Sequence, residues 1–323
     1  MRSGLRNYRP ASEDKIGLHP NPYTHYRSNT LMPAAFPSPG VFLALIKFRL
    51  LSLVLVSTCM GFFLSYRPDT SLLALVYVLI GVTLVGGGAN TLNQWWERDA
   101  DKLMQRTQKR PLVAGTISPD ATLWFGAIIT IAGLLVLALL VNMTTLSLSF
   151  LSWFSYLFLY TPLKMRHPVN TWIGAIPGAL PAILGCTAAY GLLNPTALAI
   201  FLLLYFWQLP HFLAISWVYR EDYVRGGFKM LSWNDPDGSN TAWHILLNSI
   251  VLIPVSMGLY FSGDVGPVYL LVALIASLVQ LAYAMRFHRE VSVVHAKKVF
   301  YYSIIYLPVL FLGIILDNTL ALF

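Results

Sequence analysis

The sequence predicts an all-α polytopic membrane protein, a bundle of nine transmembrane helices over residues 45–323 preceded by a tail over residues 1–44. Of its 323 residues, 56% are hydrophobic and 11% are charged, and the mean hydropathy is +0.62. Soluble domains carry about a quarter charged residues, so this composition excludes an ordinary soluble enzyme. Nine apolar stretches each approach the length of about 20 residues that a membrane-spanning helix needs.

The nine predicted spans are separated by polar connections. They lie near residues 48–66, 72–95, 120–140, 146–162, 169–190, 195–219, 243–262, 268–286 and 298–317. Short connections on one side of the membrane make neighbouring helices antiparallel. The longer loops 97–119 and 220–242 each follow a helix that becomes polar at its end, and long polar loops in a compact bundle usually carry function.

The basic residues support this count and orient the chain. The sequence has 22 Lys and Arg against 14 Asp and Glu, a net charge of +8. With nine spans, every Lys and Arg except Arg67 falls in the tail or in the loops on the same side of the membrane. Lys and Arg are retained on the cytoplasmic face, which predicts a cytoplasmic N-terminus. The positive charge therefore reflects topology and contact with anionic lipids, and it does not indicate nucleic-acid binding.

The tail is predicted to be disordered and cytoplasmic, because it is polar and rich in proline. It lacks the apolar segment of a secretory signal. Arg2, Arg6 and Arg9 are typical of a mitochondrial transit peptide, but Glu13 and Asp14 argue against one. The sequence therefore favours a bacterial cytoplasmic membrane, with the mitochondrial inner membrane as the alternative.

The strongest functional signal is the polar stretch from Asn93 to Pro111, where the second span ends. A helix turns about 100° per residue, which places Asn93, Glu97 and Asp101 within about 80° on one face. Asn90 falls on the same face. Carboxylate and amide oxygens suit Mg²⁺, which commonly bridges to phosphates. The alternative is a solvated loop of mixed charge, but amides inside an apolar span need polar partners.

Basic residues follow these acids and extend the site toward an anion. Arg106, Lys109 and Arg110 lie a few residues further on, and guanidinium groups bind phosphate in a bidentate manner. The end of the fourth span adds Lys164 and Arg166, which fit either an anion site or an ordinary topology signal. Acids for a metal next to bases for an oxyanion are expected at a diphosphate site.

The sixth span carries a second polar cluster. His211 and Asp222 are about three helical turns apart and share a face within about 20°. A lone histidine inside the membrane is more often structural than a ligand, whereas Asp222 lies at the depth of the first acidic cluster, which favours a shared metal site. Tyr160, at the end of the fourth span, fits either an interfacial aromatic belt or an aromatic face that stabilises a cation.

At these residues the sequence resembles the UbiA superfamily of intramembrane prenyltransferases, and within it the haem-farnesylating branch. The resemblance covers residues 45–317, and three stretches carry it: 93–111, 160–181 and 207–231. The superfamily has two aspartate-rich motifs, and the second is reduced here to Asp222, with Val218 one turn earlier. This reduction is typical of the haem branch and not of the quinone-type members.

Two positions depart from that branch. Met165 and Ala182 stand where it commonly has Arg and a second Pro. Any role for a base at position 165 is therefore expected to fall to Arg166.

The resemblance implies a nine-helix bundle of the UbiA type with a cavity open toward the membrane. It implies a farnesyl transfer from farnesyl diphosphate to the 2-vinyl group of haem B, which is a substrate and not a cofactor. The product, haem O, serves terminal oxidases, so the expected partners are the lipid bilayer and haem A synthase or oxidase assembly factors. The implied metal is Mg²⁺, held by Asn93, Glu97, Asp101 and Asp222.

The same resemblance assigns the remaining roles. Tyr160 is expected to shield the allylic cation, and the sequence leaves open whether His211 orients haem, ligates it or moves a proton. The expected diphosphate-binding residues are Arg106, Lys109, Arg110, Lys164 and Arg166.

Two other functions stay open. A related prenyltransferase that acts on an aromatic acid or a chlorin would need a second paired-aspartate motif, which Val218 disfavours. A transporter or channel would place ionisable groups near the bilayer midplane, whereas here they gather at the cytoplasmic ends of the spans.

Overall fold

The computed structural model describes residues 37–320, and every regular element within them is a helix. The elements are α1 (Pro39–Leu45), α2 (Phe48–Leu64), α3 (Leu72–Trp96), α4 (Arg98–Leu103), α5 (Pro119–Leu140), α6 (Met143–Phe154), the π-helix η1 (Ser155–Tyr160), α7 (Thr161–Leu163), α8 (Asn170–Tyr190), α9 (Pro195–Val218), α10 (Arg220–Arg225), the 3-10 helix η2 (Leu231–Asn234), α11 (Ser239–Ser256), α12 (Gly258–Phe261), α13 (Pro267–Arg289) and α14 (Val293–Leu320). The predicted tail, residues 1–44, lies outside the described residues as far as residue 36, and its last part enters α1.

Eight helices in this described part of the chain are long and apolar enough to cross a membrane. Two of them are composite, since α6 continues through η1 and α7, and α11 continues into α12. A ninth span results if α1 and α2 are taken together, although the chain bends by 58° between them. Counted in this way, the predicted nine-helix bundle is confirmed. The predicted first span corresponds to α2 alone, and α1 is additional.

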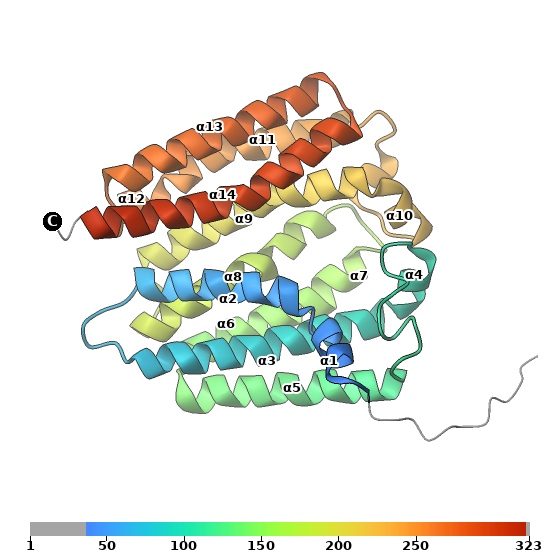
Figure 1. Cartoon of the computed structure of the whole chain (residues 1–323), viewed down its shortest axis with the longest axis horizontal. Coiled ribbons are helices and arrows are strands. Elements are labelled where there is room, and N and C mark those ends of the chain that lie inside the picture. The colour runs from blue at the N-terminus through green and yellow to red at the C-terminus, as the bar shows by residue number, and fades with distance from the viewer. Residues whose placement is uncertain (1–36, 321–323) are drawn as a thin grey trace, which may run out of the picture. The chain divides into compact units, whose positions relative to one another are not determined.

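The long helices pack in two groups that meet along α8 and α9 (Figure 1). In the first group, α8 contacts α2, α3 and α6, while α5 packs on α3. In the second group, α9 contacts α11 and α14, and α13 packs on both of these helices. The place of α8 between neighbours explains why it is the most enclosed span, with 72% of its most apolar window buried.

Glycines allow α8 to approach α2 backbone to backbone. A Cβ added at Gly185 would lie 1.9 Å from the carbonyl oxygen of Thr58. A Cβ added at Gly61 would lie 2.0 Å from the carbonyl oxygen of Ala182. Small residues at helix contacts are how membrane helices pack closely, because lipid provides no hydrophobic drive between them. The two glycines therefore allow α2 and α8 to pack closely.

The two long polar loops lie at the same end of the bundle, where α4 and α10 contact each other (Figure 1). Met104 after α4 packs in one buried cluster with Phe228 and Met230 after α10. The loops predicted to carry function therefore form one structure, although more than a hundred residues separate them in the sequence.

Candidate active site

A small polar cavity of ≈ 70 Å³ lies where α3 gives way to α4, beneath the two long loops. Its oxygen-bearing wall comes from the end of α3 and from α4. Asn93 lies in the last turn of α3, Glu97 ends that helix and Asp101 lies in α4. All three line the cavity, and each is at most 7% exposed. Asp99, between them in the sequence, is exposed and pairs with Lys102.

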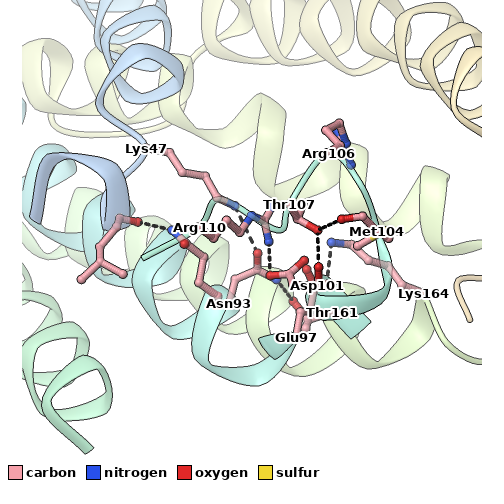
Figure 2. A network of polar contacts seen from close by, with 12 residues as sticks. Lys47, Asn93, Glu97, Asp101, Met104, Arg106, Thr107, Arg110, Thr161 and Lys164 are labelled. Atoms are coloured by element: carbon pink, nitrogen blue, oxygen red, sulfur yellow. Dashed lines mark hydrogen bonds and ion pairs between the residues drawn. The ribbon is translucent and has the colours of Figure 1, made fainter. Parts of the chain in front are cut away.

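Two ion pairs cross the cavity (Figure 2). Lys164 Nζ lies 2.7 Å from Glu97 Oε1, and Arg110 pairs with Asp101 Oδ2. Burial alone would raise the pKa of Glu97, but Lys164, Lys47 and Arg110 together outweigh burial and hold this pKa below its ordinary value. For Asp101, burial outweighs the opposing effect of Arg110, so the pKa is raised. Glu97 therefore stays ionised, while Asp101 takes up a proton more readily.

The amide of Asn93 has partners on both sides. Its Oδ1 accepts a hydrogen bond of 3.2 Å from Lys47 Nζ, and its Nδ2 donates one of 3.1 Å to Thr161 Oγ1. Lys47 lines the cavity but was not singled out in the sequence, where it is one of many basic residues that report topology. Asn90, expected on the same face as Asn93, instead donates to the carbonyl oxygen of Ile46.

The residues of this wall fit a divalent cation. Asp101 Oδ1 is buried and has no hydrogen-bond partner, and an unsatisfied buried acceptor of this kind is costly. With Glu97 and Asn93 it offers hard oxygen ligands of the type that Mg²⁺ prefers. Within residues 37–320, no three acidic, His or Cys side chains are gathered closely enough to hold a metal. A bound cation would therefore also need amide and ligand oxygens.

Asp222 is not among the residues that line this cavity, and its expected role as a fourth metal ligand stays a prediction. Its oxygens accept hydrogen bonds from the backbone N–H groups of Gln105 (3.0 Å) and Arg106 (3.1 Å), and it pairs with Arg225. Burial alone would raise the pKa of Asp222, but these donors outweigh burial and lower it. Asp222 thus fixes the loop that carries Arg106 and Arg110 over the cavity.

The predicted anion-binding residues divide into two sets. Arg106, Arg110 and Lys164 line the cavity. The Arg106 guanidinium also donates to the hydroxyl of Tyr223 at 3.1 Å. Two of the predicted residues are exposed and do not line the cavity, Lys109 and Arg166.

Aromatic rings form part of the cavity wall. Tyr160, the last residue of the π-helix η1, has its ring centroid 4.5 Å from Lys164 Nζ, and the Phe228 centroid is 5.6 Å from the same atom. The Tyr160 ring packs directly on Gly174, where an added Cβ would lie 2.5 Å from it. An aromatic face at this place is therefore available to a cation.

His211 lies away from the cavity. Its Nδ1 is 2.8 Å from the hydroxyl of Ser303, and its ring stacks on Trp207 and meets Phe300. The helical spacing predicted a face shared with Asp222, but α9 ends at Val218 and Asp222 lies in the separate helix α10. His211 is not among the residues that line the cavity.

Comparison with known proteins gives one consistent family. The model of the UbiA prenyltransferase family matches residues 54–312. The chain is 39% identical over 286 residues to the protoheme IX farnesyltransferase of Solibacter usitatus, with 86% of this chain and 98% of the relative covered. It is 37% identical to the mitochondrial protoheme IX farnesyltransferase of Arabidopsis thaliana, with 84% and 63% covered.

Solved structures show the same fold. A chain described in work on digeranylgeranylglyceryl phosphate synthase superposes with a TM-score of 0.72 at 19% identity, covering 86% of this chain and 97% of that one. A UbiA homologue from Archaeoglobus fulgidus bound to GPP and Mg²⁺ superposes with a TM-score of 0.59 at 18% identity, covering 85% and 99%.

Proposed function

The chain belongs to the UbiA prenyltransferase family, and from that membership we propose that it transfers the farnesyl group of farnesyl diphosphate to the 2-vinyl group of haem B. The products are haem O and diphosphate. The assignment of haem B as the acceptor rests on the similarity to protoheme IX farnesyltransferases, with 36% to 39% identity over most of this chain. The cavity of paired acids and bases supplies the chemistry for the donor.

Three oxygen groups would hold Mg²⁺ at the wall made by α3 and α4. These are the carboxylates of Glu97 and Asp101 and the amide oxygen of Asn93. The metal supplies positive charge that neutralises the diphosphate and makes it a better leaving group. Asp101 contributes the oxygen that lacks a partner in the free protein, so no existing hydrogen bond needs to break at that atom.

The cations of the cavity bind the oxygens of the diphosphate. Arg110 and Lys164 lie within the cavity, and Arg106 lies at its edge on the loop that Asp222 holds. Their charges stabilise the negative charge that collects on the departing diphosphate as its bond to farnesyl C1 breaks. Charge-assisted hydrogen bonds of this type are among the stronger ones in proteins.

Departure of diphosphate leaves an allylic cation on the farnesyl chain. Tyr160 and Phe228 present aromatic faces that stabilise this positive charge and exclude water from it. The vinyl group of haem B provides the electron pair for the new carbon–carbon bond. Water then adds to the resulting porphyrin-side cation and loses a proton, which gives a hydroxyethylfarnesyl side chain. His211 does not line this cavity, and its expected role toward haem or a proton stays a prediction.

The protein is a membrane protein, and we place the cavity on the cytoplasmic side of a bacterial cytoplasmic membrane or the equivalent side of a mitochondrial inner membrane. The support is the concentration of Lys and Arg at the cavity end of the spans. Both substrates have large apolar parts, so we expect them to reach the bundle through the lipid bilayer. The product is passed to an enzyme or assembly factor of the haem A and oxidase route.

One reconstitution tests the proposal. Purified protein in lipid is incubated with haem B, farnesyl diphosphate and Mg²⁺, and the extracted haems are analysed by mass spectrometry. We expect the mass of haem O, and none when EDTA removes the metal. Absence of this product, together with prenylation of an aromatic acid or a chlorin under the same conditions, would refute the assignment of the acceptor.

A further inference from the structure

Lys47 is a basic residue of the cavity that pairs with no acidic side chain. Arg110 and Lys164 each pair with a carboxylate, but Lys47 takes part in none of the ion pairs found in residues 37–320. Its Nζ bonds instead to the neutral amide oxygen of Asn93 at 3.2 Å (Figure 2). A cation in such a place is available for an anionic ligand.

The backbone around Lys47 is built to bring this side chain to the cavity. Lys47 has φ 53° and is the only residue other than glycine in the described chain with positive φ, a conformation that L-residues disfavour. It forms the corner at which α1 and α2 bend by 58°. Such a conformation persists only where the surroundings enforce it, and strained residues cluster at functional sites.

Two amides of α3 hold this corner in place. Asn90 Nδ2 donates to the carbonyl oxygen of Ile46 at 3.0 Å, and Gln94 Nε2 donates to that of Leu45 at 2.8 Å. The carbonyls at the end of a helix have no partners within it, so these bonds satisfy α1 and attach it to α3. The helix that carries the oxygen wall therefore also positions Lys47.

The cavity is lined by more basic than acidic side chains, which favours an anionic ligand. Four basic side chains line it and only two acidic ones: Lys47, Arg106, Arg110 and Lys164 against Glu97 and Asp101. In addition, Asn93, Glu97 and Asp101 each have one side-chain oxygen bound to one of these bases, and Asp101 Oδ1 is the buried carboxylate oxygen without a partner. A metal cannot take these oxygens fully until the bases turn to another partner.

We propose that Lys47 is a further diphosphate-binding residue that exchanges partners on binding. It leaves Asn93 Oδ1, which becomes a metal ligand, and it takes a phosphate oxygen instead. This inference rests on the proposed function and deepens it, because it makes metal and diphosphate each dependent on the other. The metal needs the oxygen that Lys47 covers, and Lys47 needs the anion in order to leave.

The variant Lys47→Met separates this role from a structural one. Methionine has a similar length but no charge, so Asn93 Oδ1 is free and one repulsive charge is gone. We expect Lys47→Met to bind Mn²⁺, used alone as a probe for Mg²⁺, more tightly than wild type. We expect the same variant to bind pyrophosphate in the presence of Mg²⁺ at least about tenfold more weakly, since a charge-assisted hydrogen bond is lost. Lys47→Arg should keep most of the pyrophosphate affinity.

The experiment measures Mn²⁺ binding by electron paramagnetic resonance and pyrophosphate binding by calorimetry, on full-length protein in nanodiscs. Lys102→Met is the matched control, because Lys102 is exposed and pairs only with exposed Asp99. If Lys47→Met lowers the affinity for both Mn²⁺ and pyrophosphate, or for neither, the proposed exchange of partners is wrong. If wild type itself binds no pyrophosphate with Mg²⁺, the proposed function fails instead. Thermal unfolding of each variant identifies a folding defect. If Lys47→Met does not fold, Lys47→Arg decides the outcome, and loss of pyrophosphate affinity in Lys47→Arg contradicts the proposal.

Discussion

The residues of the cavity have different partners in the free protein and in the state that reacts. In the free protein, Glu97 and Asp101 neutralise Lys164 and Arg110. Removing one member of a buried pair leaves the other charge uncompensated, which costs more than the pair contributes. Variants that keep the size of the side chain and add no new charge therefore give the clearest results.

Asp101→Asn is expected to lower the rate of haem O formation about a hundredfold or more, the range seen when one transition-state-stabilising group is removed. Asparagine keeps the shape of the side chain but loses the charge that holds the metal. The rate is measured by mass spectrometry of extracted haems, with Lys102→Met as the control. A normal yield of haem O from Asp101→Asn would remove this carboxylate from the site.

The pH dependence of metal binding follows from the raised pKa of Asp101, which burial causes against the opposition of Arg110. Metal needs the ionised carboxylate, so Mn²⁺ affinity is expected to fall as the pH is lowered, and to begin falling at a higher pH than for an ordinary aspartate. The sign for stability is opposite: a raised pKa contributes stability at low pH that is lost as the pH rises. Titration of Mn²⁺ affinity checks this, with exposed Asp99→Asn as control. An affinity that does not change in acid would be inconsistent with Asp101 as a ligand.

The sequence predicts those residues of the cavity that lie close together along one segment of the chain. Asn93, Glu97 and Asp101 line the same cavity because they are spaced four residues apart across the end of α3 and the short helix α4. The helical spacing did not indicate that Asp222 binds the backbone of Gln105 and Arg106, or that His211 contacts Ser303, because these contacts join segments far apart in the sequence. Lys47 was missed because only tertiary contacts with α3 bring the α1–α2 corner to the cavity.

The helices themselves were predictable to within a few residues, since long apolar stretches bounded by polar segments determine them. Local departures from the regular helix were not. The bend between α1 and α2, and the π-helix η1 that ends at Tyr160, have no periodic signal in the sequence. π-helical turns often occur at functional sites, and this one places Tyr160 in the cavity wall.

Gly185→Ala is expected to destabilise the protein by about 1–3 kcal/mol, the usual cost of overpacking. The added methyl group would meet the backbone of Thr58 at 1.9 Å, and a backbone cannot move aside as a flexible side chain can. Thermal unfolding in detergent measures the change. Gly258→Ala is the matched control, because the nearest atom to its added Cβ is 3.8 Å away. Equal melting temperatures for the two variants would show that α2 and α8 do not pack this closely.

Across the whole molecule, charge and fold give the same orientation. The cavity lies at the end of the bundle where the basic loops gather, and of the Lys and Arg in residues 37–320 Arg67 alone lies in a loop at the other end. We therefore expect this distribution to place the cavity on the cytoplasmic face, where a charged, water-soluble diphosphate can leave. The shared membrane depth of the two acidic clusters predicted that their loops meet, but the packing of the two helix groups could not be predicted, because it depends on contacts between distant segments.

This orientation is tested by labelling single cysteines in a variant in which Cys59 and Cys186 are replaced. Asp69→Cys lies in the exposed loop after α2, and Gln108→Cys lies in the exposed loop after α3. A membrane-impermeant maleimide is expected to label Asp69→Cys in intact cells, and Gln108→Cys only after permeabilisation. The reverse pattern would place the cavity on the opposite face.

The most direct test is a structure of the protein with Mn²⁺ and an unreactive thio analogue of farnesyl diphosphate. We expect an anomalous peak for the metal between Asn93, Glu97 and Asp101, with the diphosphate against Arg110 and Lys164 and the first isoprene unit beside Tyr160. A metal bound elsewhere, with this cavity still closed by its own ion pairs, would contradict the account.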